Sequence, residues 1–199
     1  MRYILIGVDF RNITDTKKDI DRGVISKQLD LMCNCIRSSL FISECVRRNT
    51  ETIIFDPDFN KIIVLKGFKL KYMGPDLRSI SLLMIRAFNA LIIDSEKKVY
   101  STTPGIYIIQ ETITEYLKNI LNEHTLIYYA DYTPINETII KIDSNILIVY
   151  FESAVKDKIV GKLEKFNLKP LQFDSKVRLT PCEFIIIYQN YLDLMLNEP

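Results

Sequence analysis

Short apolar runs alternate with amphipathic patterns of helical period along this chain. Apolar, β-rich runs bounded by turn residues predict buried strands, and the first of them covers residues 3–8. Further strands are expected at 52–55, 61–66, 125–130, 145–151 and 168–173. Helical spacing of apolar residues predicts helices from residue 29 onward and at 80–93, 111–122, 155–166 and 182–196. This alternation is typical of an α/β fold with a mostly parallel sheet.

Turn and loop residues separate these elements. Residues 12–21 are polar and charged and predict a loop, as does the segment 101–105. The residues 47–49 are expected to end the first helix, and 56–58 to form a turn between two paired strands. In sheets of this kind ligands bind at the carboxyl ends of strands, so a cofactor is expected beside the loop after Phe151 or the segment after Phe173.

Composition narrows the class of protein. The chain has 199 residues, of which 48% are apolar and 26% charged, and its net charge is +1. Near-neutral charge argues against strong sequence-independent binding of nucleic acid, although a local basic patch remains compatible with it. No apolar run approaches the roughly 18 residues of a membrane span, which predicts a cytoplasmic protein.

Cysteine and histidine usage argues against a metal site. Cys33, Cys35 and Cys45 are expected within one helix, no Cys-x-x-Cys pair occurs, and His124 is the one histidine. A structural zinc site needs four suitably spaced ligands, so we expect no metal and reduced, buried cysteines.

The stretches 28–48, 74–79 and 101–107 each carry a motif of a known family, and together they resemble the archaeal tRNA pseudouridine-54 N1-methyltransferase family of the SPOUT superfamily. The first runs from Gln28 to Arg48. Within it, residues 28–35, which include Leu29-Asp30-Leu31, match the family's R-L-D-L-L-x-x-C, residues 40–43 match F-x-L-S, and residues 46–48, which include Arg47-Arg48, match I-R-R. The second, 74–79, is similar to S-P-D-E-R-N, and the third, 101–107, is similar to S-T-P-G-I-Y. The similarity extends over roughly residues 28–193.

The resemblance implies a fold and a set of site residues. It implies one SPOUT-like domain, 1–199, with an N-terminal half at 1–95 and a trefoil-knotted C-terminal half at 96–199. Asp30 is then the candidate base or orienting residue of an active enzyme. The residues expected to bind tRNA or ribosomal RNA are Arg47, Arg48, Lys69, Lys71 and Arg78. An arginine guanidinium can donate two hydrogen bonds to one phosphate. Lys66, Lys69 and Lys71 are interleaved with Phe68 and Tyr72, a pattern that can bind an RNA backbone and stack on a base.

The chain departs from the family where S-adenosylmethionine is held. The family loop I-G-D-H-x-G is matched by residues 148–154, which lack both glycines, and a second loop at 129–134 also lacks glycine. The third cofactor-binding segment of the family is L-S-P before the last helix, with a cysteine inside that helix. It matches either 174–176, with Phe184 at the position of the cysteine, or 179–181, with Cys182 nearby. The vestigial cofactor residues are therefore Tyr150, Phe151, Glu152, Ser153 and Cys182.

Glycine permits close backbone approach, so its loss predicts a filled pocket and no bound cofactor. Two functions follow from this. The first is a catalytically inactive RNA-binding protein on tRNA or the ribosome. The alternative is an active S-adenosylmethionine-dependent pseudouridine N1-methyltransferase with a diverged pocket. The resemblance also implies a homodimer through the knot region.

Overall fold

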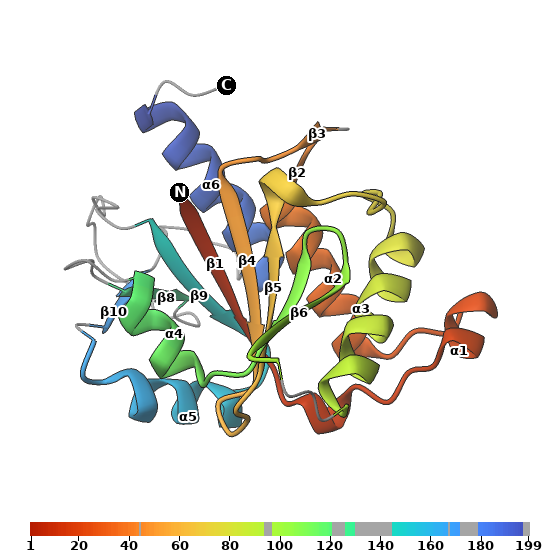
Figure 1. Cartoon of the computed structure of the whole chain (residues 1–199). Helices are drawn as coiled ribbons and strands as arrows, with labels where there is room; N and C mark the ends of the chain where they lie inside the picture. Colours follow the sequence, from red (N-terminus) through yellow and green to blue (C-terminus); the bar gives the residue numbers. More distant parts are fainter. Residues whose placement is uncertain are drawn as a thin grey trace.

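A single eight-stranded sheet organises the chain in the computed structural model, which describes residues 1–43, 45–93, 97–120, 126–129, 145–166, 168–171 and 179–196 (Figure 1). The strand order is β10-β8-β9-β1-β4-β5-β7-β6. The strands are β1 (Arg2–Gly7), β4 (Thr50–Phe55), β5 (Ile62–Lys66), β6 (Val99–Thr103), β7 (Ile106–Ile109), β8 (Leu126–Tyr129), β9 (Ile146–Tyr150) and β10 (Leu168–Leu171).

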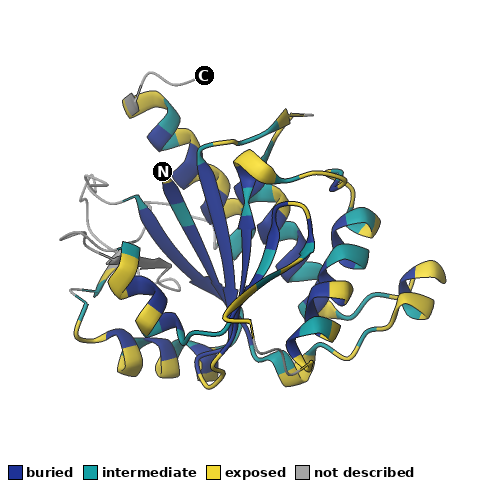
Figure 2. Cartoon of the chain, in the orientation of Figure 1, coloured by how far each residue is buried: buried dark blue, intermediate teal, exposed yellow. Residues whose placement is uncertain are grey.

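The sheet is mostly parallel, as the sequence predicts. Strand β1 lies between β4 and β9 and is parallel to both, and β8 and β10 extend this parallel part beyond β9. Antiparallel pairs link β4 to β5, β5 to β7, and β7 to β6 on the other side. Strands from both halves of the chain therefore share one sheet, whose central strands are dark blue in Figure 2 because they are buried.

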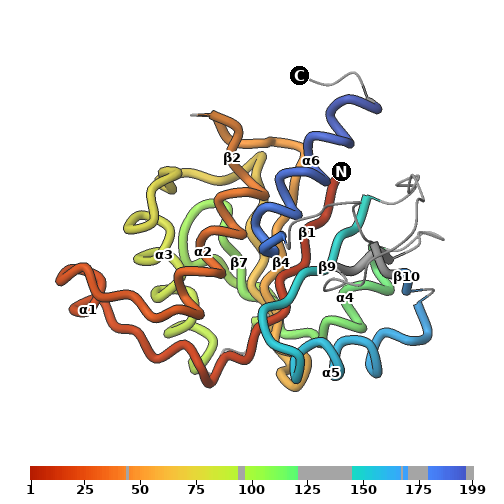
Figure 3. The backbone as a smooth tube through the Cα atoms, turned by 180° about the vertical axis from the view of Figure 1, so that it is seen from behind, coloured from red at the N-terminus to blue at the C-terminus, as the bar shows by residue number. Residues whose placement is uncertain are grey.

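Helices cover both faces of the sheet. Helices α2 (Lys27–Leu40), α3 (Leu77–Leu91) and α6 (Pro181–Leu196) lie together on one face, with α1 (Lys17–Asp21) beside α3 (Figure 3). Helices α4 (Ile113–Ile120) and α5 (Ser153–Leu163) lie on the other face. Among the described residues no helix is long and apolar enough to cross a membrane.

The first predicted helix is real but ends earlier than expected. Ser26 caps α2 by accepting a hydrogen bond from the Leu29 amide at 3.3 Å, and the helix stops at Leu40 instead of at 47–49. The chain then forms a small antiparallel pair, β2 (Phe41–Ile42) and β3 (Cys45–Val46). The Arg47 amide donates to the Leu40 carbonyl at 2.7 Å and so holds the pair at the helix end. The expectation of Cys45 in the helix is therefore wrong.

Two predicted loops contain regular structure. The segment 12–21 includes α1, which begins with a capping box between Thr16 and Asp19. Strand β6 occupies most of 101–105 and pairs with β7 across Pro104 and Gly105. Gly105 has a φ of +91°, and a side chain there would overlap the backbone of Leu70. The tight turn thus depends on glycine, which removes the steric cost of positive φ.

Candidate functional site

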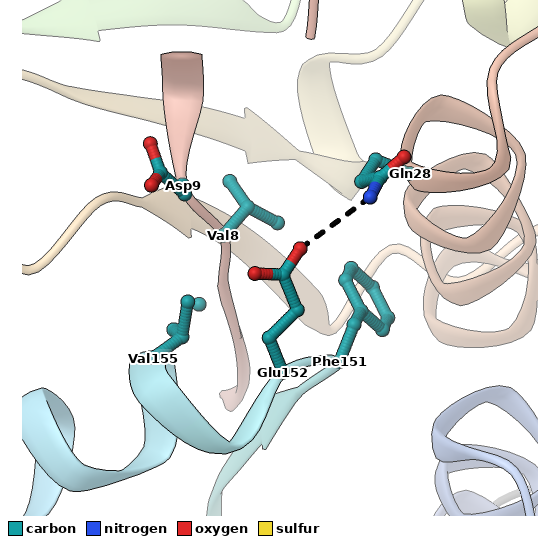
Figure 4. Close-up of a pocket in the computed structure, with 7 residues that line it drawn as sticks. Val8, Asp9, Gln28, Phe151, Glu152 and Val155 are labelled. Atoms are coloured by element: carbon teal, nitrogen blue, oxygen red, sulfur yellow. Dashed lines mark hydrogen bonds between the residues drawn. The ribbon is translucent and has the colours of Figure 1, made fainter. Parts of the chain in front are cut away.

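A small pocket lies where β1 and β9 end at the carboxyl edge of the sheet (Figure 4). The enclosed space is only about 10 Å³, room for about one water molecule, so the described residues form one wall of any larger site. Residues 130–134 of the second loop matched to the family lie outside the described residues, as does 174–176, one of the two matches to L-S-P. The lining residues are Gly7, Val8, Asp9, Gln28, Phe151, Glu152 and Val155.

Glu152 is the polar centre of this wall. Its Oε1 accepts hydrogen bonds from Nδ2 of Asn12 at 3.3 Å and from Nε2 of Gln28 at 3.5 Å. These contacts join the end of β9, the start of α2 and the short helix η1 (Phe10–Asn12). Gln28, which replaces the family's arginine, thus orients a carboxylate of the site itself.

A second carboxylate, Asp9, stands on the same wall. Its pKa is lowered, chiefly because the Arg11 side chain donates hydrogen bonds to it, at 2.9 Å from Nε and 2.6 Å from Nη2. Asp9 is consequently an anion at neutral pH. Both of its oxygens are bound by Arg11, so Glu152, whose hydrogen bonds come from neutral amides, is the carboxylate of this wall that can attract a cationic group.

The two aromatic residues at the end of β9 face opposite sides of the sheet. Tyr150 pairs in register with Gly7, and a side chain at Gly7 would meet Val155 and Ile159 of α5. Since paired residues in a sheet point the same way, the Tyr150 ring lies on the α5 face, where it is 5% exposed. Of the two rings, Phe151 lines the pocket and Tyr150 does not.

Ser153 and Cys182 start two helices near this edge of the sheet. Ser153 is the exposed first residue of α5. Cys182 lies in the first turn of α6, with its Sγ 3.1 Å from Oγ1 of Thr180. Thr180 also caps α6 together with Glu183, and the helix begins at Pro181. The choice between the two matches to L-S-P stays a prediction.

Asp30 lies near the pocket but does not line it. Its Oδ1 accepts a hydrogen bond from Nδ2 of Asn34, one turn later, at 3.1 Å. Asp30 is two positions from Gln28, and residues so spaced on a helix point in different directions. The role of Asp30 stays a prediction.

Sequence reasoning missed the part of the wall that comes from the N-terminus. Gly7, Val8 and Asn12 precede the stretches that carry the family resemblance. A usable signal was present, because the strand expected at 3–8 must end at the same edge as the other parallel strands.

The five predicted RNA-binding residues lie in different environments. Arg47 is mostly buried, with 8% of its side chain exposed, and pairs with Asp193 of α6 at 2.7 Å. Arg78 is exposed and pairs with Asp21 of α1 at 2.7 Å. Arg48, Lys69 and Lys71 are exposed. The backbone at Gly67, two residues before Lys69, packs directly against the Arg47 carbonyl, so that a side chain at Gly67 would overlap it.

Comparison with known proteins places the chain in a family. The family described as "Putative SAM-dependent RNA methyltransferase" matches residues 1–184. The chain is 30% identical to the tRNA (pseudouridine(54)-N(1))-methyltransferase of Methanococcus maripaludis strain C6, over 84% of this chain and 86% of the relative. It is 26% identical to the enzyme of that name from Methanocaldococcus jannaschii, over 92% and 93%.

A solved structure shares the fold. Archaeoglobus fulgidus Nep1, a SPOUT protein solved with S-adenosylhomocysteine bound, superposes with a TM-score of 0.55 at 10% identity and covers 98% of both chains. The SPOUT-like α/β fold is thereby confirmed. The trefoil knot stays a prediction.

These findings overturn the expectation that the chain has no cofactor. The matching family is described as SAM-dependent, and the protein of shared fold holds S-adenosylhomocysteine. The physical reason lies in β9, where Tyr150 is packed against α5 and leaves only one ring at the pocket. Because the family model covers nearly the whole chain, this protein belongs to the SAM-dependent RNA methyltransferase family of the tRNA pseudouridine-54 N1-methyltransferases.

Proposed function

We propose that the chain is an active methyltransferase that transfers a methyl group from S-adenosylmethionine to N1 of a pseudouridine in tRNA. The observation that carries this proposal is the family match, which extends over residues 1–184 and so includes both halves of the sheet. Relatives named for this reaction align along 84% and 92% of the chain. The pocket wall lies where such sheets bind ligands, at the carboxyl ends of β1 and β9.

The described wall fits S-adenosylmethionine chemically. The cofactor supplies an electrophilic methyl group on a sulfonium, and it also carries an ammonium, ribose hydroxyls and an adenine ring. The carboxylate of Glu152 suits a positive charge or a hydroxyl donor, because its hydrogen bonds come from neutral amides. Phe151 offers a ring face to a heterocycle.

The protein's own contribution is to orient the base and accept its proton. When N1 of pseudouridine gains the methyl group it loses its hydrogen, and a carboxylate near N1 accepts that proton. We assign this step to Asp30, whose carboxylate is oriented by the Asn34 amide. Positioning of the two reactants accounts for the rest of the rate enhancement.

The remaining parts of the proposal concern partners. Arg48, Lys69, Lys71 and Arg78 contact RNA phosphates, and Arg47 supports that surface from its ion pair with Asp193. A homodimer through the knot region is supported by apolar side chains that α6 leaves exposed, at Ile186, Ile187, Leu194 and Met195. One domain, 1–199, acts in the cytoplasm on tRNA, and its C-terminal half, 96–199, carries the knot.

The test is methyl transfer to defined RNA. Two tRNA transcripts that differ only in pseudouridine or uridine at the target position are incubated with S-adenosylmethionine, and nucleosides are identified by mass spectrometry. We expect N1-methylpseudouridine from the first transcript alone. Asp30→Asn should abolish the product, whereas Asp157→Asn, on the exposed side of α5, should leave it unchanged. RNA binding without product or cofactor binding would refute the proposal in favour of a structural role on tRNA or the ribosome.

A further inference from the structure

A loop at the amino edge of the sheet exposes an unusual set of side chains. It follows β5 and contains the short helix η2 (Gly67–Lys69) and residues up to Gly74. Lys69 and Lys71 are exposed, as is Phe68 at 45%, and Tyr72 is 80% exposed. Large aromatic side chains usually bury most of their surface, so two exposed rings beside two lysines require an explanation.

The loop is fixed on both sides of Tyr72. The Lys71 amide donates to the Pro104 carbonyl at 3.1 Å, and the Gly74 amide donates to Oγ of Ser79 at 2.9 Å. Met73, between these anchors, is buried. The backbone on either side of the exposed ring is therefore held by the β6–β7 turn and by α3.

Tyr72 itself adopts a strained backbone conformation. Its φ is +65°, in the left-handed region that glycine and asparagine tolerate and that bulky residues rarely adopt. The ring gains nothing from burial in exchange for this strain. An observed outlier of this kind in an exposed, anchored loop points to a function for the side chain.

The lysines are organised for an anionic partner. Lys69 Nζ lies 5.5 Å from the ring centre of Phe68 and 6.0 Å from that of Tyr107. These rings hold the Lys69 ammonium group at the surface without neutralising it. Lys66, by contrast, is paired with the buried carboxylate of Glu51 at 3.4 Å and is not part of this surface. Cations interleaved with exposed rings are the elements that bind the backbone and the bases of single-stranded nucleic acid.

We infer that this loop surface, formed by Phe68, Lys69, Lys71 and Tyr72, is a second RNA site in which the Tyr72 ring stacks on an unpaired base while the lysines bind flanking phosphates. The identity of the partner as RNA rests on the proposed function.

The position of this surface sets the size of the substrate. The surface adjoins the start of β4, which pairs with the start of β1. The pocket lies beyond the end of β1. A strand rises about 3.3 Å per residue, so β1 separates the two sites by roughly 20 Å. RNA that reaches both sites must extend roughly 20 Å beyond the target base. A large folded RNA such as tRNA meets this requirement, whereas a hairpin cut back to the target loop and too short to span this distance does not.

The test separates ring from backbone. Tyr72→Gly and Tyr72→Asn both remove the ring and relieve the positive φ, so their melting temperatures should equal or exceed that of the parent protein. Affinity for a pseudouridine-containing tRNA transcript, measured without cofactor, should fall about tenfold in both, as expected for loss of one stacked base. Tyr72→Phe should bind normally.

The lysines and the length of the RNA supply the controls. Lys71→Ala should weaken tRNA binding and reduce the slope of log K against log salt by about one, whereas removing the Tyr72 ring should leave that slope unchanged. Lys118→Ala, an exposed lysine of α4, is the matched control and should change neither. A short hairpin carrying the target loop should bind all variants equally.

The opposite results are equally clear. If Tyr72→Gly and Tyr72→Asn bind tRNA as tightly as the parent protein does, the inference is wrong. An acidic protein would then be the partner that fits this surface. Equal losses on tRNA and on the short hairpin would overturn the two-site geometry. Since binding needs no turnover, failure of methyl transfer would refute the proposed function without deciding this test.

Discussion

Removing the carboxylate of Asp193 is expected to destabilise the protein strongly. Asp193, on α6, accepts hydrogen bonds from two arginines, Arg2 at the start of β1 and Arg47 after β3. The Arg2 side chain is 2% exposed, that of Arg47 is 8% exposed, and that of Asp193 is 16% exposed. In Asp193→Ala two guanidinium groups would remain buried without their shared anion.

The magnitude follows from this burial. Breaking a buried ion pair by removing one partner costs about 3–5 kcal/mol, because the remaining charge is uncompensated. Arg2 keeps a hydrogen bond to Oε1 of Gln189 at 3.0 Å, which favours the lower part of this range. The lower part of the range is about 3–4 kcal/mol. For a chain of this length 1 kcal/mol shifts the melting temperature by about 2–4 °C, so we expect a decrease of about 6–16 °C.

The same interaction gives a pH dependence of defined sign. Burial raises the pKa of Asp193, but hydrogen bonds from Arg2 and Arg47 outweigh burial, and the pKa lies below its ordinary value. A carboxylate with a lowered pKa in the folded state adds stability above its unfolded pKa of about 3.9, and this stability is lost as the pH falls through the folded value. Asp193→Asn should therefore differ most from the parent near neutral pH and least in acid.

The assay is urea denaturation of the parent, Asp193→Ala and Asp193→Asn between pH 3 and pH 7, together with Asp157→Asn as an exposed control. A loss below about 1 kcal/mol in Asp193→Ala at pH 7 would refute the reasoning, since that is the range of an exposed pair. A loss that does not shrink in acid would equally contradict the assigned cause.

Three further outcomes are expected. Arg48→Ala should weaken tRNA binding and its salt dependence without lowering the melting temperature, because this side chain is exposed; unchanged binding would remove Arg48 from the RNA surface. Gly105→Ala should destabilise the protein by about 1–3 kcal/mol in urea denaturation, because Gly105 has a φ of +91° and the added methyl group would overlap the backbone of Leu70, and a neutral effect would contradict the geometry of this turn. Maleimide at pH 7, followed by peptide mass mapping, should label exposed Cys45 before Cys33, because burial raises the pKa of Cys33 to about 12; the reverse order would contradict the burial assignment.

Local sequence determined the regular elements that bury a continuous face. Strand β1 and helix α3 appear at nearly the expected positions because the period of their apolar residues reports burial directly. The order of such elements, together with the family motifs, was sufficient to predict a mostly parallel α/β sheet. The short elements α1, β2 and β6 escaped prediction because they depend on a capping box, a helix end and a glycine turn rather than on periodicity.

The roles of adjacent residues were decided by tertiary structure. Arg47 and Arg48 look equivalent in the sequence, yet only Arg47 meets Asp193, which lies 146 positions away. Tyr150 and Phe151 look equally able to fill the cofactor pocket, yet the register of β9 against β1 places the Tyr150 ring under α5 and leaves Phe151 at the pocket. Sequence alone established the family and the edge of the sheet where its chemistry occurs. Which side chain of each pair faces a ligand depended on long-range packing and strand register, because neither is encoded by a residue's neighbours in the chain.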